Sequence, residues 1–245
     1  MKKQIPNAIT LCNLLCGCIA TIYALQGELP FAAGFVVLGI FFDFFDGMLA
    51  RVLHVESGIG LQLDSLADMI TSGLVPGIFM VQLLFMSGIS PTPINLWSEV
   101  HFYLDTDTFI PLLGLLIVLA SAYRLAKFNM DVRQTSSFIG LPTPANALLI
   151  ISLPLILIYQ PSEIAFQLIL NPWILIALTV LSCYLLNAEI PLFSLKFKTK
   201  SFKSNSIRYV FLLLSVVLLV SFWFVAIPMV IFLYVVLSVL FKGKK

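Results

Sequence analysis

The sequence predicts an all-α integral membrane protein with about eight transmembrane helices and both termini in the cytoplasm. Of its 245 residues, 60% are hydrophobic and only 11% are charged, and the mean hydropathy is +1.05. The apolar residues gather in long runs, and the basic residues stand only at the termini and around alternate gaps between the runs. These three observations favour helices that cross a bilayer over a soluble fold.

Eight apolar runs are each about long enough to cross the hydrocarbon core, which takes about 20 helical residues. The first follows two lysines, but it is long and lacks a small-x-small cleavage site, so we expect a retained helix rather than a signal peptide. The second ends in aspartates and an arginine, and the third opens with aspartates. The fourth ends in basic residues, the fifth follows a Leu-Pro-Thr-Pro stretch, and the sixth precedes a lysine-rich loop. The last two are short and separated only by residues 226–228. The predicted spans are 8–26, 31–50, 65–87, 109–128, 142–159, 166–187, 207–224 and 226–241.

The basic residues set the predicted orientation. With the N-terminus in the cytoplasm, all 14 lysines and arginines fall on the cytoplasmic side, as the positive-inside rule requires. The opposite loops, including the long one at about 88–108, carry acids and no basic residue. The basic positions are Lys2, Lys3, Arg51, Arg124, Lys127, Arg133, Lys196, Lys198, Lys200, Lys203, Arg208, Lys242, Lys244 and Lys245.

Four aspartates lie at the ends of two of these apolar runs. Asp43 and Asp46 close the second span, and Asp64 and Asp68 open the third. One aspartate at the centre of a membrane helix costs roughly 2.5–3.5 kcal/mol, so acids kept in such a place are candidates for a function. Spacings of three and four put each pair on one face of a helix. Two such faces brought together form an oxygen cage that suits magnesium or manganese.

Small residues share the acidic face of each helix. Gly39, Gly47 and Ala50 lie on the face of Asp43, and Gly60 lies on the face of Asp64. Absent side chains leave room for a ligand or for close packing of helices. Because the acids stand near the cytoplasmic ends of both spans, the site is expected just inside the inner interface, open to a water-soluble group.

These residues form a motif that resembles the signature of the CDP-alcohol phosphotransferases. It reads Asp43-x-x-Asp46-Gly47-x-x-Ala50-Arg51, then eight residues, then Gly60-x-x-x-Asp64-x-x-x-Asp68. Further stretches are similar to the phosphatidylserine synthase branch: residues 5–13, Ser57, Ser65, residues 123–129, 140–145 and, more loosely, 186–191. The resemblance covers about residues 5–200. Lys127 and Ala188 stand where the branch leads us to expect Arg and Ser.

The resemblance implies a single membrane domain over residues 1–245, with a catalytic core at about 5–200 and an accessory helix pair at 207–241. It implies transfer of a phosphatidyl group from CDP-diacylglycerol to the hydroxyl of L-serine, with release of CMP. It also implies two divalent cations, Mg²⁺ or Mn²⁺, and a homodimer in the cytoplasmic membrane whose active site faces the cytoplasm. The expected partners are these substrates and membrane lipid, with no nucleic acid.

The same resemblance assigns roles to residues. The four aspartates hold the metals, and Asp68 is also the general base that accepts the proton of the attacking hydroxyl. Arg51 would hold a phosphate through its guanidinium fork, although a role as an interface anchor is also open. The expected CDP-lipid contacts are Asn7, Thr10, Gly47, Ala50, Arg51, Ser57 and Gly60. The expected contacts to the acceptor or to a phosphate are Arg124, Lys127 and Asn129, with interface anchoring as the alternative for the two cations.

Two alternatives stay open from the sequence. A sister enzyme would use glycerol 3-phosphate, inositol phosphate or choline as the acceptor. A phosphorylated acceptor needs further cations near the site, and the sequence offers only Arg51, Arg124, Lys127 and Arg133. The other alternative is an ion-coupled transporter, but such proteins place their acids near mid-membrane in related halves, and no second half repeats these acids.

Overall fold

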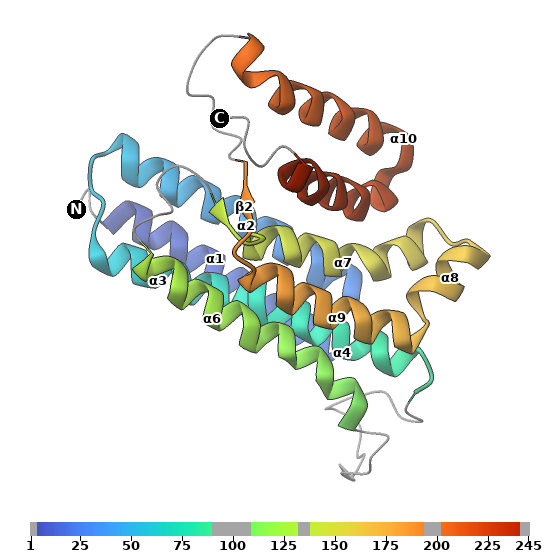
Figure 1. Ribbon diagram of the computed structural model, residues 1–245. Coiled ribbons are helices and arrows are strands. Elements are labelled where there is room, and N and C mark those ends of the chain that lie inside the picture. The colour runs from blue at the N-terminus through green and yellow to red at the C-terminus, as the bar shows by residue number, and fades with distance from the viewer. Residues whose placement is uncertain (1–3, 90–108, 132–137, 194–201, 241–245) are drawn as a thin grey trace.

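The computed structural model of the chain describes residues 4–89, 109–131, 138–193 and 202–240, and these are almost entirely helical (Figure 1). The chain begins with α1 (Gln4–Leu25) and α2 (Leu29–Val52), which are joined by a turn in which Gly27 has a φ of +80°. Pro30 lies in the first turn of α2, where its missing N–H costs no helical hydrogen bond. The two helices pack against each other and form the N-terminal hairpin.

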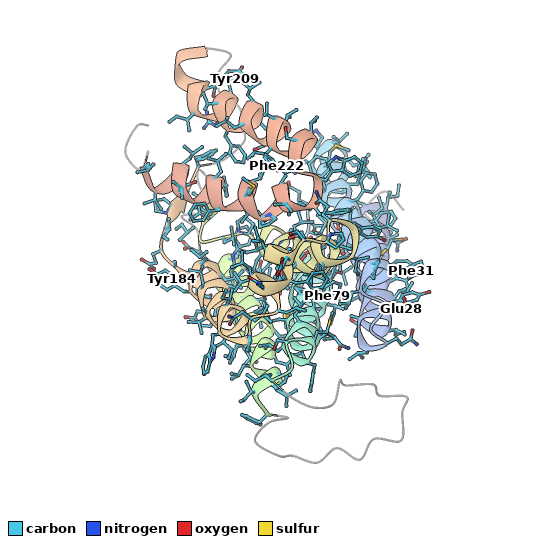
Figure 2. All side chains as sticks on the ribbon, turned by 90° about the vertical axis from the view of Figure 1, so that its right-hand side faces the viewer. Glu28, Phe31, Phe79, Tyr184, Tyr209 and Phe222 are labelled. Carbon is cyan, nitrogen blue, oxygen red and sulfur yellow. The ribbon has the colours of Figure 1, made fainter. Side chains whose placement is uncertain are left out.

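A central helix follows, built from three segments without a break: α3 (Gly58–Asp68), the π-helix η1 (Met69–Leu74) and α4 (Val75–Met86). Its α4 part is apolar on all sides, which is typical of a helix surrounded by other helices. Figure 2 shows Phe79 of α4 within the bundle, where it is fully buried, and Phe31 and Tyr184 at its edges, where each is more than 60% exposed. The core of the protein therefore lies around α4.

The next helices surround this central one. The 3-10 helix η2 (Ile110–Leu115) leads into α6 (Leu116–Met130). Gly77 lets α6 approach α4 closely: a Cβ at this position would lie only 2.4 Å from Val118 Cγ2. After it come α7 (Thr143–Tyr159), α8 (Glu163–Ile169) and α9 (Pro172–Asn187). The α8 and α9 axes differ by 62°, and the Asn171 side chain caps α9 by accepting from two backbone N–H groups.

Two short strands join the loops that precede α7 and α10. β1 (Phe138–Ile139) and β2 (Pro191–Leu192) are antiparallel, with Phe138 opposite Leu192 and Ile139 opposite Pro191. Gly140 follows β1 with a φ of +75°, and a Cβ at this position would lie 2.6 Å from the carbonyl oxygen of Leu186. Only glycine fits this turn without strain. The close approach brings the start of α7 against the end of α9, where the Leu141 N–H donates to the Leu185 carbonyl at 2.8 Å.

The last element, α10 (Phe202–Leu240), consists of two arms that turn back on each other (Figure 1). They meet at Trp223, whose φ of 48° and ψ of −118° are not helical. The break frees the backbone N–H of Val225, which donates to Gln160 Oε1 at the end of α7, at 3.2 Å. The sequence places this break at residues 226–228; the structure places it slightly earlier, where Gln160 satisfies the freed donor.

The prediction of a multi-span helical membrane protein is confirmed in its coarse form. Among the described residues, five helices are long and apolar enough to cross a membrane, or six if α8 and α9 are counted as one bent span. The shorter α7 is apolar as well, and the last two predicted spans are the arms of α10. The number eight and the cytoplasmic termini stay predictions. The long loop at 90–108 and several of the orienting basic residues lie outside the described residues: Lys2, Lys3, Arg133, Lys196, Lys198, Lys200, Lys242, Lys244 and Lys245.

Candidate active site and metal centre

The turn between α2 and α3 brings the two acidic faces to the same end of the bundle. α2 ends in a Schellman-type turn, in which the N–H of Val55 donates to the Ala50 carbonyl at 3.0 Å and His54 has a φ of 54°. Ser57 then caps α3 by accepting from the N–H of Gly60 at 3.1 Å. Because α1 packs against both helices, the acids face one another beside α1.

Three of the four predicted metal ligands converge. Asp43, Asp46 and Asp64 each offer a carboxylate oxygen, and these oxygens all lie within 4.8 Å of one another. Asp46 is only 4% exposed, and its Oδ2 has no hydrogen-bond partner among the described residues. A buried, unpaired carboxylate oxygen is costly unless a cation compensates it. The donor set consists of oxygens alone, so it fits a hard divalent cation such as Mg²⁺ or Mn²⁺.

Asp68 lies beside this group but is not a member of it. Its side chain is 8% exposed and interacts electrostatically with Asp43, Asp46 and Asp64. The amide of Asn13, on α1, donates to Asp68 Oδ1 at 3.4 Å. Asp68 lies one turn after Asp64 on α3, and this offset separates it from the other three acids. It therefore lies beside the carboxylate oxygens that could hold a cation, a location that suits a general base.

Asn13 is a site residue that the sequence reasoning missed. It is fully buried, its carbonyl accepts from the Thr71 hydroxyl at 3.1 Å, and its Oδ1 has no partner among the described residues. The available signal was its position three residues after Thr10, on the same side of an apolar helix. A polar side chain there needs a partner inside the bundle.

The residues expected to contact the CDP-lipid fall into two groups. In the first, a Cβ on Gly60 would lie 3.2 Å from both Asn7 Oδ1 and Ser57 Oγ, so these three positions are neighbours. Thr10 is buried beside Asp46, with which it interacts, and its hydroxyl donates to the Pro6 carbonyl at 3.1 Å. The structure therefore joins Asn7, Thr10, Ser57 and Gly60 along one side of the acids.

The second group lies on the last turn of α2. Arg51 is exposed, and its Nε donates to the Gly47 carbonyl at 2.8 Å. A Cβ on Gly47 would approach Arg51 Nη2 to 3.7 Å, and Ala50 is half-buried. The guanidinium is thus held against its own helix, and its exposed position makes it accessible to a phosphate group.

The three residues proposed for the acceptor separate in the structure. Arg124 turns inward: it is 7% exposed, it lies 5.9 Å from the centre of the Phe128 ring, and it interacts electrostatically with Asp68. Lys127 instead pairs with Glu189 at 3.5 Å on the surface. Asn129 exchanges hydrogen bonds with Ser65 at 2.9 and 3.2 Å, which ties α6 to α3. Of the three, Arg124 is the buried one whose charge interacts with Asp68, and Asn129 bonds to the residue that follows Asp64.

The arrangement combines a cation-binding set of carboxylates, a fourth carboxylate beside it, and a buried guanidinium whose Nε has no hydrogen-bond partner among the described residues. Such a site can bind a doubly charged phosphate compound through metals, accept a proton and hold a second anionic group. These are the capabilities that a phosphoryl-type transfer requires.

Comparison with known proteins shows which family and which enzymes the chain is similar to. The model of the family described as CDP-alcohol phosphatidyltransferase matches residues 3–185. The CDP-diacylglycerol–serine O-phosphatidyltransferase of Bacillus subtilis (strain 168) is 32% identical over 146 residues, which cover 58% of this chain and 70% of that protein. The enzyme of the same name from Helicobacter pylori (strain ATCC 700392 / 26695) is 30% identical over 60% of this chain and 55% of its own length. The archaetidylserine synthase of Methanothermobacter thermautotrophicus is 29% identical to this chain. The matched region covers 67% of this chain and 64% of that protein.

Proposed function

Because this chain belongs to the CDP-alcohol phosphatidyltransferase family, we propose that it moves a phosphatidyl group from CDP-diacylglycerol to the hydroxyl of L-serine. The products are phosphatidylserine and CMP. Two of the relatives described above carry the name of this activity. The observation that carries the proposal is the convergence of three carboxylates beside Asp68 and the buried Arg124.

The reaction is a substitution at the phosphorus that bears the diacylglycerol. The serine oxygen forms a new bond to this phosphorus, the bond to the CMP oxygen breaks, and the hydroxyl proton passes to Asp68. Asp43, Asp46 and Asp64, with Asp68 as a shared ligand, would hold two divalent cations, Mg²⁺ or Mn²⁺. These cations would neutralise the phosphate oxygens and the charge that develops on CMP.

The side chains divide the substrate between them. The CDP group would lie along Gly47, Ala50 and Gly60, where missing or small side chains permit close approach. Arg51 would hold a phosphate on the solvent side, and the polar contacts would come from Asn7, Thr10 and Ser57. These roles are supported by the common location of the residues around the acids.

Arg124 would bind the carboxylate of the acceptor. It is buried, its Nε–H is unpaired among the described residues, and it interacts with Asp68, the proposed base. Lys127 is engaged by Glu189, which leaves less positive charge for a phosphorylated acceptor. This balance favours the single carboxylate of serine over glycerol 3-phosphate or inositol phosphate, and choline has no anionic group for Arg124 to bind.

The protein is a multi-pass membrane protein, and its active site is proposed to open to the cytoplasm from the cytoplasmic membrane. The positive-inside pattern supports this orientation. A homodimer and a single domain over the whole chain, with the α10 arms as an accessory pair, are supported by the family resemblance alone.

The choice of acceptor is tested by measuring CMP release from CDP-diacylglycerol by the purified protein in detergent with Mn²⁺. L-Serine, glycerol 3-phosphate, inositol phosphate and choline are supplied one at a time. CMP release is expected with L-serine, together with labelled phosphatidylserine when the serine is labelled. Release with one of the other acceptors and not with L-serine would assign the chain to a sister activity.

A further inference from the structure

Asn13 is the residue through which α1 is bonded to the helix that carries the proposed base. It lies on α1, which packs against both α3 and η1. Its side chain is fully buried, and its amide nitrogen donates to Asp68 Oδ1 at 3.4 Å. The Thr71 hydroxyl donates to the backbone carbonyl of Asn13 at 3.1 Å. Two hydrogen bonds therefore tie Asn13 to positions on either side of the start of the π-helix.

Close packing limits how the Asn13 side chain can turn. Its Oδ1 lies against α2, because a Cβ on Gly39 would approach this oxygen to 2.8 Å. One turn further along α1, a Cβ on Gly17 would clash with the Thr71 hydroxyl, so α1 and η1 are also in close contact. Turning the amide over would place Oδ1 against the Asp68 carboxylate, where two acceptors repel each other. The NH₂ group therefore stays directed at Asp68.

The hydrogen bond to Asp68 is the only one that the Asn13 side chain makes among the described residues, where its Oδ1 is buried without a partner. Burying an unpaired polar atom is costly, so a side chain that served packing alone would be better apolar. The amide donor therefore explains why an asparagine stands here. At 3.4 Å the bond is long, as catalytic hydrogen bonds often are before a substrate binds.

We propose that Asn13 is a positioning residue for Asp68. Its NH₂ group occupies Oδ1, which leaves Oδ2 as the oxygen that receives the proton of the acceptor hydroxyl. A base that is oriented by a third group is a general arrangement in catalysis. In the step itself the serine oxygen bonds to phosphorus, the bond to the CMP oxygen breaks, and the proton passes to Asp68, while Asn13 keeps its own protons. The inference rests on the proposed function, because it takes Asp68 to be the base.

The test is the kinetics of Asn13→Ala with CDP-diacylglycerol, L-serine and Mn²⁺. The kcat should fall about 10- to 100-fold, the effect of losing a hydrogen bond to a charged group. The KM for each substrate and the Mn²⁺ concentration for half-maximal release should stay within about twofold, because Asn13 acts on the base alone. Thr21→Val is the matched control. Thr21 is half-buried on the same helix, its hydroxyl donates to the Gly17 carbonyl at 2.9 Å, and its replacement should change none of these values.

Two further variants separate positioning of Asp68 from a general structural effect. Asn13→Leu keeps the branched shape of the side chain and also lacks the donor, so it should show the same fall in kcat even if Asn13→Ala folds poorly. When Asp68→Asn is already present, Asn13→Ala should cause no further fall. A wild-type kcat in either folded Asn13 variant would overturn the inference, as would a fall of equal size with and without Asp68→Asn.

Two other results would also overturn it. A raised KM for L-serine with an unchanged kcat would make Asn13 a substrate contact, and a raised Mn²⁺ requirement would place its action on the metal ligands. A wild-type protein that releases CMP with another acceptor, and not with L-serine, would refute the proposed function alone. The comparison of Asn13→Ala with the wild type would then be made with that acceptor.

Discussion

At the scale of single residues, the site contains three of the buried polar atoms that have no hydrogen-bond partner among the described residues. Asp46 Oδ2, Asn13 Oδ1 and Arg124 Nε are all buried and unpaired among the described residues. Leaving such an atom unsatisfied costs about 1–3 kcal/mol, and more when the group is charged. A bound ligand would compensate these three groups. The aspartate suits a cation as its ligand, and the guanidinium suits an anion.

The sequence predicted some of these residues better than others. The four aspartates were recognisable because no packing role requires acids in apolar helices. Arg124 and Lys127 are three residues apart, on nearly the same helix face, so spacing does not tell which one turns inward. Glu189 decides the matter: it pairs with Lys127 from a loop far along the chain. In the same way, spacing does not show that Asn129 donates to Ser65 and thereby links α6 to α3.

Replacing the proposed base tests Asp68 directly. Asp68→Asn keeps an oxygen that accepts from Asn13 but loses the ability to take the serine proton, so kcat should fall by about 10²–10⁴-fold. Binding of CDP-diacylglycerol, measured with a fluorescent analogue, should persist. Glu56→Gln, an exposed acid in the turn before α3, serves as the control and should leave kcat unchanged. A kcat for Asp68→Asn equal to that of the control would remove Asp68 from the base role.

Close helix packing sets the site at the scale of elements. A Cβ on Gly39 of α2 would lie 2.6 Å from Thr71 Cγ2 of η1 and 2.8 Å from Asn13 Oδ1 of α1. The glycine therefore lets three elements meet one turn away from Asp43. Directly after Asp68, the helix becomes the π-helix η1, and such segments often accompany functional sites. Together these features fix where the acids point.

A pair of glycine substitutions on α2 tests this packing. Gly39→Ala should lower the free energy of unfolding by about 1–3 kcal/mol, because the added methyl group overpacks a site with no free space. It should also reduce turnover, because Thr71 and Asn13 must move. At Gly34, on the same helix, a Cβ meets nothing within 4 Å, so Gly34→Ala should be neutral or stabilising. Thermal unfolding in detergent measures both, and equal midpoints would show that close packing at Gly39 is unimportant.

The helices were predictable from the long apolar runs, whereas the exact positions of their breaks were not. The helical runs appear at the expected places, since a long apolar run has few alternatives in a membrane. The break at Trp223 and the 62° bend between α8 and α9 depend on the side chains of Gln160 and Asn171. Such tertiary or capping contacts leave no periodic signal in the sequence. The π-helix after Asp68 has none either.

At the scale of the whole molecule, segments distant in sequence complete the site. α1 supplies Asn13, α2 and α3 supply the acids, and α6 supplies Arg124. The sequence motif locates only the part contained in α2 and α3.

The central claim, that the carboxylates of α2 and α3 bind catalytic divalent cations, is tested most directly by CMP release under metal depletion. Purified protein is treated with a chelator, supplied with CDP-diacylglycerol and L-serine, and then titrated with Mn²⁺ or Mg²⁺. Release should stop on chelation and return with either cation in the wild type, but it should not return in Asp46→Asn, because that variant lacks a buried ligand. A chelated wild-type protein that keeps releasing CMP at its original rate would contradict the account.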